Sequence, residues 1–193
     1  MDTAKSTVIR CFVAIEIPES IQALLKSVQT DLQPQIHKAS WTKPGNFHLT
    51  LKFLGDVHPE AINDISDAIQ RVTDTHPSFS IAFGGIGGFP NLARPRVIWM
   101  GVKQGASTLS RLAKAVNREL THLGFSTDTR FHSHLTLARL RTATNLKPLK
   151  NIPRKYDTIV GGSIRVNEIT LMQSRLHPNG AIYTPLSVHH FSA

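Results

Sequence analysis

Cysteine is almost absent from this chain, since Cys11 is the only one among 193 residues. A single thiol excludes an internal disulfide and a zinc site built from several cysteines. The sequence also lacks a hydrophobic run long enough for a signal peptide or a membrane-spanning helix, because the apolar segment around Val13 is short and contains charged residues. These absences predict a cytoplasmic protein that does not cross a membrane.

Acidic residues are scarce as well. The chain has 13 Asp and Glu against 22 Lys and Arg, so its formal net charge at pH 7 is +9. Residues 129–156 contain no acidic residue and seven Lys or Arg. This distribution favours a polyanionic partner such as RNA, and a solvated surface without a partner is the alternative.

Low-complexity segments are missing, and hydrophobic residues make up 40% of the chain. This composition excludes a disordered protein, and the length suits one domain or two small lobes. We therefore expect residues 1–193 to form a single domain and a monomer.

The clearest positive signal is an internal repeat. The tetrad His-Leu-Thr-Leu that begins at His48 returns at His134, 86 residues later. A strand-like apolar run precedes each copy at a similar distance, and another run follows each copy. Each half therefore has the pattern of strand, helix, motif strand, connection and strand, as expected after a duplication. The preceding runs are centred on Val13 and Ile98, and the following runs cover 79–83 and 164–169.

Apolar positions at helical spacing predict three amphipathic helices. The first begins at Pro18, the second follows Pro59 and stops before Pro77, and the third opens at Ser107. The sequence thus predicts an α+β fold with two similar lobes related by a pseudo-two-fold axis. Each lobe is expected to hold an antiparallel sheet with helices on its outer face, and the active site is expected in the central cleft. Residues 84–88, which are rich in glycine, are expected to form a flexible strand end near that cleft.

Side chains of a strand alternate between its two faces. Strict alternation places His48, Thr50 and Lys52 on one face of the first motif strand and Phe53 on the other. The second copy repeats this arrangement with His134 and Thr136. We expect the His and Thr side chains to face the cleft and the leucines to pack into the core.

Two imidazoles and two hydroxyls in one cleft suit the hydrolysis of a phosphodiester. One neutral imidazole can take a proton from water, one protonated imidazole can give a proton to the leaving oxygen, and hydroxyls can bind the phosphate oxygens. In-line attack needs the two groups on opposite sides of phosphorus, which a two-fold arrangement supplies. A module that binds RNA ends without turnover remains an alternative.

With these motifs, the sequence resembles the 2H phosphoesterases, and within them the RNA 2′,3′-cyclic phosphodiesterases once described as 2′-5′ RNA ligases. The resemblance implies hydrolysis of a 2′,3′-cyclic phosphate at an RNA end, tRNA fragments included, to a 2′-phosphomonoester without metal or nucleotide cofactor. It also implies reverse 2′-5′ ligation. Beyond the tetrads, the resemblance rests on residues 10–15, Trp41, 46–55, 95–99, 123–125 and 131–139.

The resemblance also implies a role for each motif residue. His48 would be the proton donor to the leaving 3′ oxygen and His134 the proton acceptor from water, with Thr50 and Thr136 on the phosphate. Arg139 matches a basic position of the family that would also contact the phosphate. Strict alternation places Arg139 on the face opposite His134, so it either lies at the strand end or is not a ligand.

Several other features are weaker. Ser133 stands where similar sequences carry proline, which affects how the second strand begins. The candidate substrate-binding residues are Trp41 and Phe53, which could stack on a base, and Arg130, which lies in the basic stretch. The close histidine pairs lack a carboxylate at ligand spacing, so we expect no metal and no other cofactor. Hydrolysis of small cyclic nucleotides is a third alternative, and ATP-dependent ligation is disfavoured because no Lys-x-Asp-Gly motif occurs.

Overall fold

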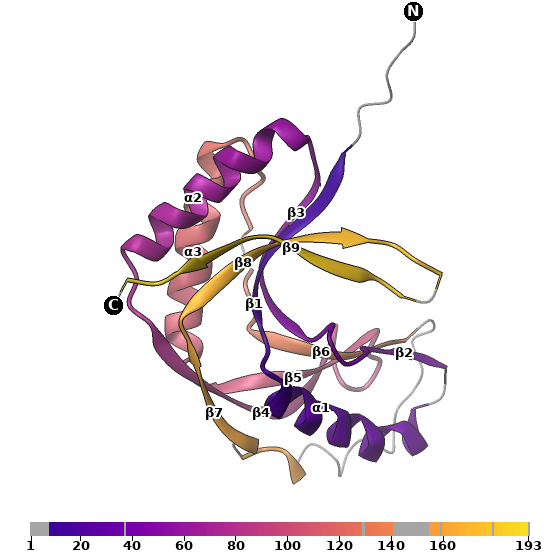
Figure 1. The fold of residues 1–193 in the computed structure, drawn as a ribbon. Helices are drawn as coiled ribbons and strands as arrows, with labels where there is room; N and C mark the ends of the chain where they lie inside the picture. Colours follow the sequence, from indigo (N-terminus) through magenta and orange to yellow (C-terminus); the bar gives the residue numbers. More distant parts are fainter. Residues whose placement is uncertain are drawn as a thin grey trace, which may run out of the picture.

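Two β-sheets form the centre of the computed structural model, and helices pack against them (Figure 1). Most of the basic stretch 129–156 lies outside the residues that the structure describes. The described residues are 8–36, 38–128, 130–140, 155–158, 160–178 and 180–192. In chain order the elements are β1 (Ile9–Glu16), α1 (Glu19–Leu32), the 3-10 turn η1 (Gln33–Gln35), β2 (Ala39–Trp41), β3 (His48–Val57), the 3-10 turn η2 (Pro59–Ala61), α2 (Ile62–Asp74), β4 (Phe79–Phe89), β5 (Val97–Gln104), α3 (Ala106–His122), β6 (His134–Leu140), β7 (Val160–Val166), β8 (Glu168–Arg175) and β9 (Ile182–His190).

The predicted α+β class with two antiparallel sheets is confirmed. One sheet has the strand order β3-β1-β8-β9 and the other has the order β2-β6-β5-β4-β7. The first motif strand, β3, belongs to the first sheet and the second motif strand, β6, belongs to the second. The lobes are not contiguous in sequence, because β4 from the first half of the chain lies in the second sheet and β8 and β9 lie in the first.

The single strand expected over 164–169 is wrong. Asn167 separates β7, which pairs with β4 in the second sheet, from β8, which pairs with β1 in the first. The chain therefore passes from one lobe to the other at this residue. Ile164 and Val166 alternate with polar residues, but the alternation breaks at Glu168, and β8 then has consecutive buried residues from Ile169 to Met172.

The three predicted helices are confirmed, with short 3-10 turns after α1 and before α2. Helices α2 and α3 lie side by side against the first sheet, where α2 contacts β8 and β9 and α3 contacts β3 (Figure 1). Helix α1 packs against the second sheet, and the side chain of its buried Gln29 donates hydrogen bonds to the carbonyls of Leu137 in β6 and Thr42 beside β2. Among the helices of the described residues, none is long and apolar enough to cross a membrane.

Each motif strand contains a bulge at its second leucine. In β3, Thr50 pairs with Ala14 and Lys52 pairs with Val13, so Leu51 has no partner of its own in β1. In β6, the neighbours of Leu137 pair with consecutive residues of β5 in the same way. A bulge adds one residue to a strand and thereby reverses which side chains face the core.

These bulges correct the predicted faces beyond each tetrad. The side chain of Lys52 is buried, with an exposed fraction of 2%, whereas Phe53 is 64% exposed. In β6, Ala138 is buried and Arg139 is exposed. Strict alternation was therefore wrong for Lys52, Phe53 and Arg139, and right for the His and Thr side chains that precede the bulge.

The glycine-rich segment 84–88 is not a strand end. It lies inside β4, which continues to Phe89. Its first two glycines, Gly84 and Gly85, form a bulge opposite β5, because Phe83 pairs with Val102 and Ile86 pairs with Met100. Glycine in a strand interior often marks such a bulge or a close approach of another group.

Candidate active site

His48 is held in a fixed orientation at the start of β3. Its Nδ1 atom lies 3.0 Å from the carbonyl oxygen of Asn46. A carbonyl only accepts hydrogen bonds, so Nδ1 must donate its proton, and Nε2 is left to accept or donate a proton in the cleft. The ring packs against Phe12, at 4.7 Å between centroids, and against the edge of Tyr183, at 4.9 Å.

His134 is held in the same way at the start of β6. Its Nδ1 atom lies 2.7 Å from the carbonyl oxygen of His132, again two residues earlier in the chain. Phe89 meets the ring edge-on at 5.0 Å between centroids, and Trp99 lies 6.2 Å away. Both imidazoles are therefore fixed in the tautomer whose Nε2 is available for proton transfer.

Burial determines the protonation of both rings in the unliganded protein. The pKa of His48 is lowered from 6.5 to about 4, mainly by desolvation and to a lesser extent by the positive charges of Arg139 and His134, while the hydrogen bond to Asn46 opposes the shift. Desolvation also lowers the pKa of His134, with further contributions from His132 and Arg139. Both imidazoles are accordingly neutral near pH 7 when no anion is bound.

Two cavities lie between the sheets, one beside each motif histidine. His48 lines a cavity of about 680 Å³ together with Trp41 and Arg139. His134 lines a cavity of about 450 Å³ together with Thr50 and Arg130. Phe53 contributes to both walls, so it stands between the two spaces.

The structure thus brings most of the predicted site residues to one cleft. Thr136 lies on the same face of β6 as His134, since the leucines on either side of it are fully buried. Arg139 lines the cavity beside His48 because of the bulge, so strict alternation does not exclude it as a ligand. It occupies the position in β6 that Phe53 occupies in β3, 86 residues apart.

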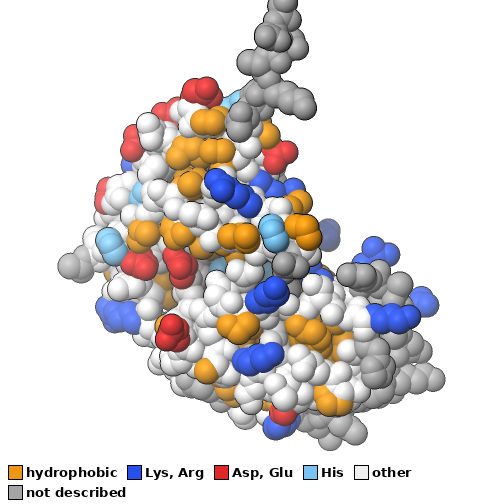
Figure 2. All heavy atoms as spheres, turned by 45° about the vertical axis from the view of Figure 1, so that its right-hand side comes forward, with side chains coloured by type: hydrophobic (Ala, Val, Ile, Leu, Met, Phe, Trp, Pro, Cys, Tyr) orange, Lys and Arg blue, Asp and Glu red, His pale blue; other side chains and the backbone are white. Residues whose placement is uncertain are grey.

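Basic side chains surround this cleft. Figure 2 shows Lys and Arg side chains beside the hollow between the two lobes, whereas the Asp and Glu side chains on this face lie mostly to its left. Such a potential attracts a polyanion and raises its local concentration. The basic residues that line the two cavities are Arg10, Lys43, Lys52, Lys114, Arg130 and Arg139.

The described residues contain no group of three or more His, Cys, Asp and Glu side chains arranged to hold a metal ion. His132 and His134 lie close together, with 6.1 Å between ring centroids. Because the Nδ1 atom of His134 is bonded to a carbonyl, only its Nε2 would remain for a ligand.

Both halves of the chain match one protein-family model. The model described as "LigT like Phosphoesterase" matches residues 15–99 and 101–183, which together span most of the chain. The chain belongs to this family. Each matched segment contains one of the two tetrads, so the family match covers both motif strands.

Curated relatives of this phosphoesterase cover almost its whole length. A protein of Archaeoglobus fulgidus named "RNA 2′,3′-cyclic phosphodiesterase" is 37% identical over 93% of this chain and 98% of its own. A protein of the same name from Aquifex aeolicus is 34% identical over 92% of this chain and 94% of its own.

Solved structures share the fold of this phosphoesterase. The crystal structure of the protein TT0787 of Thermus thermophilus superimposes with a TM-score of 0.80 at 28% identity and covers 95% of this chain and 98% of its own. The apo form of LigT from E. coli superimposes with a TM-score of 0.79 at 26% identity and covers 97% of this chain and all of its own.

Sequence reasoning missed the residues that hold and surround the two imidazoles. The aromatic rings of Phe12, Tyr183 and Phe89 come from strands outside the tetrads, and no pattern in the sequence assigns them to the site. The carbonyl contacts were accessible in principle, because Asn46 and His132 both stand two residues before a motif histidine.

Lys52 is a further residue whose place was not foreseen. Its buried ammonium donates hydrogen bonds to the side chain of Asn117 in α3 at 2.8 Å, to the carbonyl of Ser126 at 2.7 Å and to Asp128 at 3.2 Å. These acceptors use all three of its protons. Lys52 therefore ties the first motif strand of the phosphoesterase to the segment that leads into the second.

Proposed function

We propose that this phosphoesterase hydrolyses the 2′,3′-cyclic phosphate at RNA ends, tRNA fragments among them, to a 2′-phosphomonoester. His48 is the general acid and His134 the general base, and the reaction uses no metal and no nucleotide cofactor. The observation that carries the proposal is the matched pair of imidazoles, each fixed through Nδ1 and each leaving Nε2 to the cleft. The names of the curated relatives support the substrate class.

Each bond change in this reaction has a partner in the cleft. His134 Nε2 takes a proton from water, and the water oxygen attacks phosphorus. The bond between phosphorus and O3′ breaks on the opposite side, and O3′ takes the proton of His48 Nε2. Thr50, Thr136 and Arg139 hold the non-bridging oxygens, where hydrogen bonds from a hydroxyl and a guanidinium stabilise the extra negative charge of the transition state.

The acid needs a proton that the unliganded site does not hold at neutral pH. Burial keeps the pKa of His48 at about 4, so the ring is neutral until an anion binds. A phosphate beside the ring favours its charged form and raises this pKa. Substrate binding and proton uptake are therefore linked, whereas His134, whose pKa is also lowered, is already in the basic form.

The assigned roles also orient the nucleoside. O2′ and O3′ belong to the same ribose, so the ribose must lie on the side of the group that protonates O3′. That side is the cavity of about 680 Å³, where Trp41, Phe53 and Tyr183 offer aromatic faces to the base. Water then enters from the His134 side, where Arg130 lines the smaller cavity.

A 5′-labelled RNA that ends in a 2′,3′-cyclic phosphate tests the proposal when it is incubated with the protein in EDTA. We expect a 2′-phosphomonoester, identified by phosphorus NMR or by phosphatases specific for the 2′ or 3′ position. A 3′-phosphate product would reverse the acid and base roles. Activity that is lost in EDTA and restored by a divalent ion would make the histidines metal ligands.

Ligation in the reverse direction follows from the same geometry. A 5′-hydroxyl would take the place of water beside His134, and its attack on the cyclic phosphate would form a 2′-5′ linkage. Incubation of a cyclic-phosphate RNA with a 5′-hydroxyl RNA, followed by a nuclease that does not cut 2′-5′ bonds, detects this product.

A further inference from the structure

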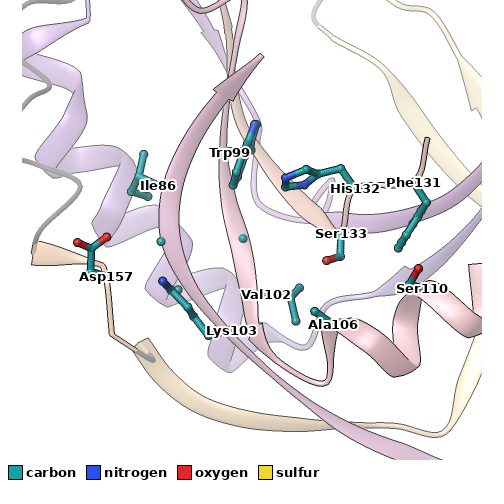
Figure 3. Close-up of a pocket in the computed structure, with 13 residues that line it drawn as sticks. Ile86, Trp99, Val102, Lys103, Ala106, Ser110, Phe131, His132, Ser133 and Asp157 are labelled. Carbon is teal, nitrogen blue, oxygen red and sulfur yellow. The ribbon is translucent and has the colours of Figure 1, made fainter. Parts of the chain in front are cut away.

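A third cavity, of about 490 Å³, adjoins the site on its water side (Figure 3). It shares Ser110, Phe131 and His132 with the cavity that His134 lines, so the two spaces adjoin. The proposed reaction places no group in this third cavity. Its lining also includes Gly84, Gly85, Trp99, Lys103, Ala106 and Asp157.

Backbone rather than side chains forms one wall of this cavity. Gly84 and Gly85 occupy the bulge of β4, and Gly85 has a positive φ of 76°. A Cβ atom at Gly84 would lie 2.2 Å from the carbonyl oxygen of Thr158, and one at Gly85 would lie 3.1 Å from Cε of Lys103. A side chain at either position would meet Thr158 or Lys103, so both positions favour glycine and the backbone itself forms this part of the lining.

The cavity presents one cation and one carboxylate. Figure 3 shows Lys103 and Asp157 on the side of the cavity away from His132. Lys103 is exposed and makes no ion pair with any described residue. A bare phosphate would be attracted by Lys103 and repelled by Asp157. A nucleotide satisfies both groups, because it combines an anionic phosphate with N–H donors on its base.

Aromatic rings form the wall toward the catalytic cleft. The rings of Trp99 and His132 lie 4.6 Å apart between centroids and are tilted by 55°. Figure 3 shows both side chains at the same end of the cavity, with Phe131 farther along. Stacking on such rings is how proteins hold the bases of single-stranded RNA.

We propose that this cavity binds a second RNA nucleotide, with its phosphate at Lys103 and its base between the aromatic wall and Asp157. The inference rests on the proposed function and extends it beyond the reacting end. The nucleotide lies on the side from which water attacks. Because the ribose of the cyclic end lies on the His48 side, this geometry favours the 5′ end of a second strand, and the preceding nucleotide of the same strand, folded back past the phosphate, is the alternative that the experiment distinguishes.

Three substrates and three variants of the full chain distinguish whether the second nucleotide comes from the same RNA strand or from another strand. The substrates are a mononucleoside 2′,3′-cyclic phosphate, a dinucleotide with the same cyclic end, and the mononucleoside substrate with a 5′-hydroxyl oligonucleotide added. Lys103→Met removes the cation and Ala106→Phe fills the cavity from α3. Lys26→Met removes an exposed charge from α1 and is the matched control.

We expect both cavity variants to change hydrolysis of the mononucleoside substrate by less than about two-fold. If the nucleotide comes from the same strand, kcat/KM on the dinucleotide falls about tenfold in both variants and stays unchanged in Lys26→Met. If it comes from a second strand, inhibition by the 5′-hydroxyl oligonucleotide weakens about tenfold instead. The proposal would be overturned if all three variants showed the same kcat/KM on the dinucleotide and the same inhibition by the 5′-hydroxyl oligonucleotide.

Calorimetry of a dinucleoside monophosphate separates this inference from the proposed function, because it does not depend on turnover. Weaker binding by Lys103→Met and Ala106→Phe, with Lys26→Met unchanged, supports the nucleotide site even if no cyclic phosphate is hydrolysed. Equal affinity in all variants overturns it even if hydrolysis proceeds as proposed.

Discussion

The motif strands β3 and β6 carry the same tetrad and bend in the same way, yet they present different side chains to the cleft. Each fixes its histidine through the carbonyl two residues earlier, and each bulges at the second leucine. The bulge then turns Phe53 into the cleft from β3 and Arg139 from β6. Similar backbone geometry orients the two histidines in the same way, while the unequal side chains that follow them make the two sides of the cleft different.

The surroundings of the two imidazoles differ as well. His48 packs against Phe12 and Tyr183, whereas His134 lies near Phe89, Trp99 and a second imidazole at His132. Between two identical groups, a cyclic phosphate could bind in two orientations, with its ribose beside either histidine. The different walls, with the Arg139 guanidinium on β6 and the Phe53 ring at the equivalent position of β3, favour one sense, because binding energy then differs between the two orientations.

Among the variants considered, removal of either motif imidazole should lower turnover the most. We expect His48→Ala and His134→Ala each to lower kcat on a cyclic-phosphate end by about 10² to 10⁴-fold, because each loses one proton transfer. RNA affinity should change far less. His122→Ala, at the exposed end of α3, is the control that should leave turnover unchanged. Near-normal turnover in both motif variants would favour the alternative of a non-catalytic RNA-binding module.

Lys52 in β3 and Ala138 in β6 occupy equivalent positions of the repeat, but Lys52 carries a buried charge and Ala138 only a methyl group. Lys52→Met therefore tests what this charge contributes to the first motif strand alone. The variant removes the donor that Asn117, Ser126 and Asp128 share, although Asn117 keeps the hydrogen bond from the Asp128 backbone N–H. We expect a loss of about 3 kcal/mol in the free energy of unfolding. Chemical denaturation measures this loss. Asp128→Asn should cost less, since that side chain is half exposed. Equal stability of Lys52→Met and the unaltered chain would contradict the anchoring role.

The burial of His48 predicts a loss of stability in acid. Its pKa is 6.5 in the unfolded chain and about 4 in the folded protein, so the unfolded state takes up the proton first as pH falls. The stability present above pH 6.5 is therefore lost toward pH 4, by at most about 3 kcal/mol. His48→Asn should flatten this dependence in denaturation curves measured across that range. An unchanged slope in the variant would mean that His48 is not the titrating group.

Replacing Arg139 or Phe53, the side chains that the two bulges turn toward the cleft, gives the smallest of these effects. Arg139→Met should lower kcat/KM on a mononucleoside cyclic phosphate by about tenfold, because a charged contact to the phosphate is lost. It should also raise the pKa of both histidines and move the pH profile of kcat/KM upward. Phe53→Leu should leave that profile in place and raise KM. An identical pH profile in both variants would remove Arg139 from the site.

Much of this architecture could be predicted from the sequence alone. The repeated tetrads placed four site residues on two strands, because the period of a strand is local and needs no knowledge of its partner. The helices α1, α2 and α3 were predicted because helical periodicity is also local, and the apolar residues of each segment indicate which face is buried. The absence of cysteine pairs and long apolar runs likewise follows from composition.

The tertiary structure decided what the local patterns could not. The bulges at Leu51 and Leu137 depend on how β3 and β6 pair with their neighbours, and they alone bring Phe53 and Arg139 to the cleft. The passage between sheets at Asn167 depends on which strands lie free to pair. The register of a strand and the choice of its partner depend on contacts between residues far apart in the chain. The periodicity of one segment therefore does not predict them.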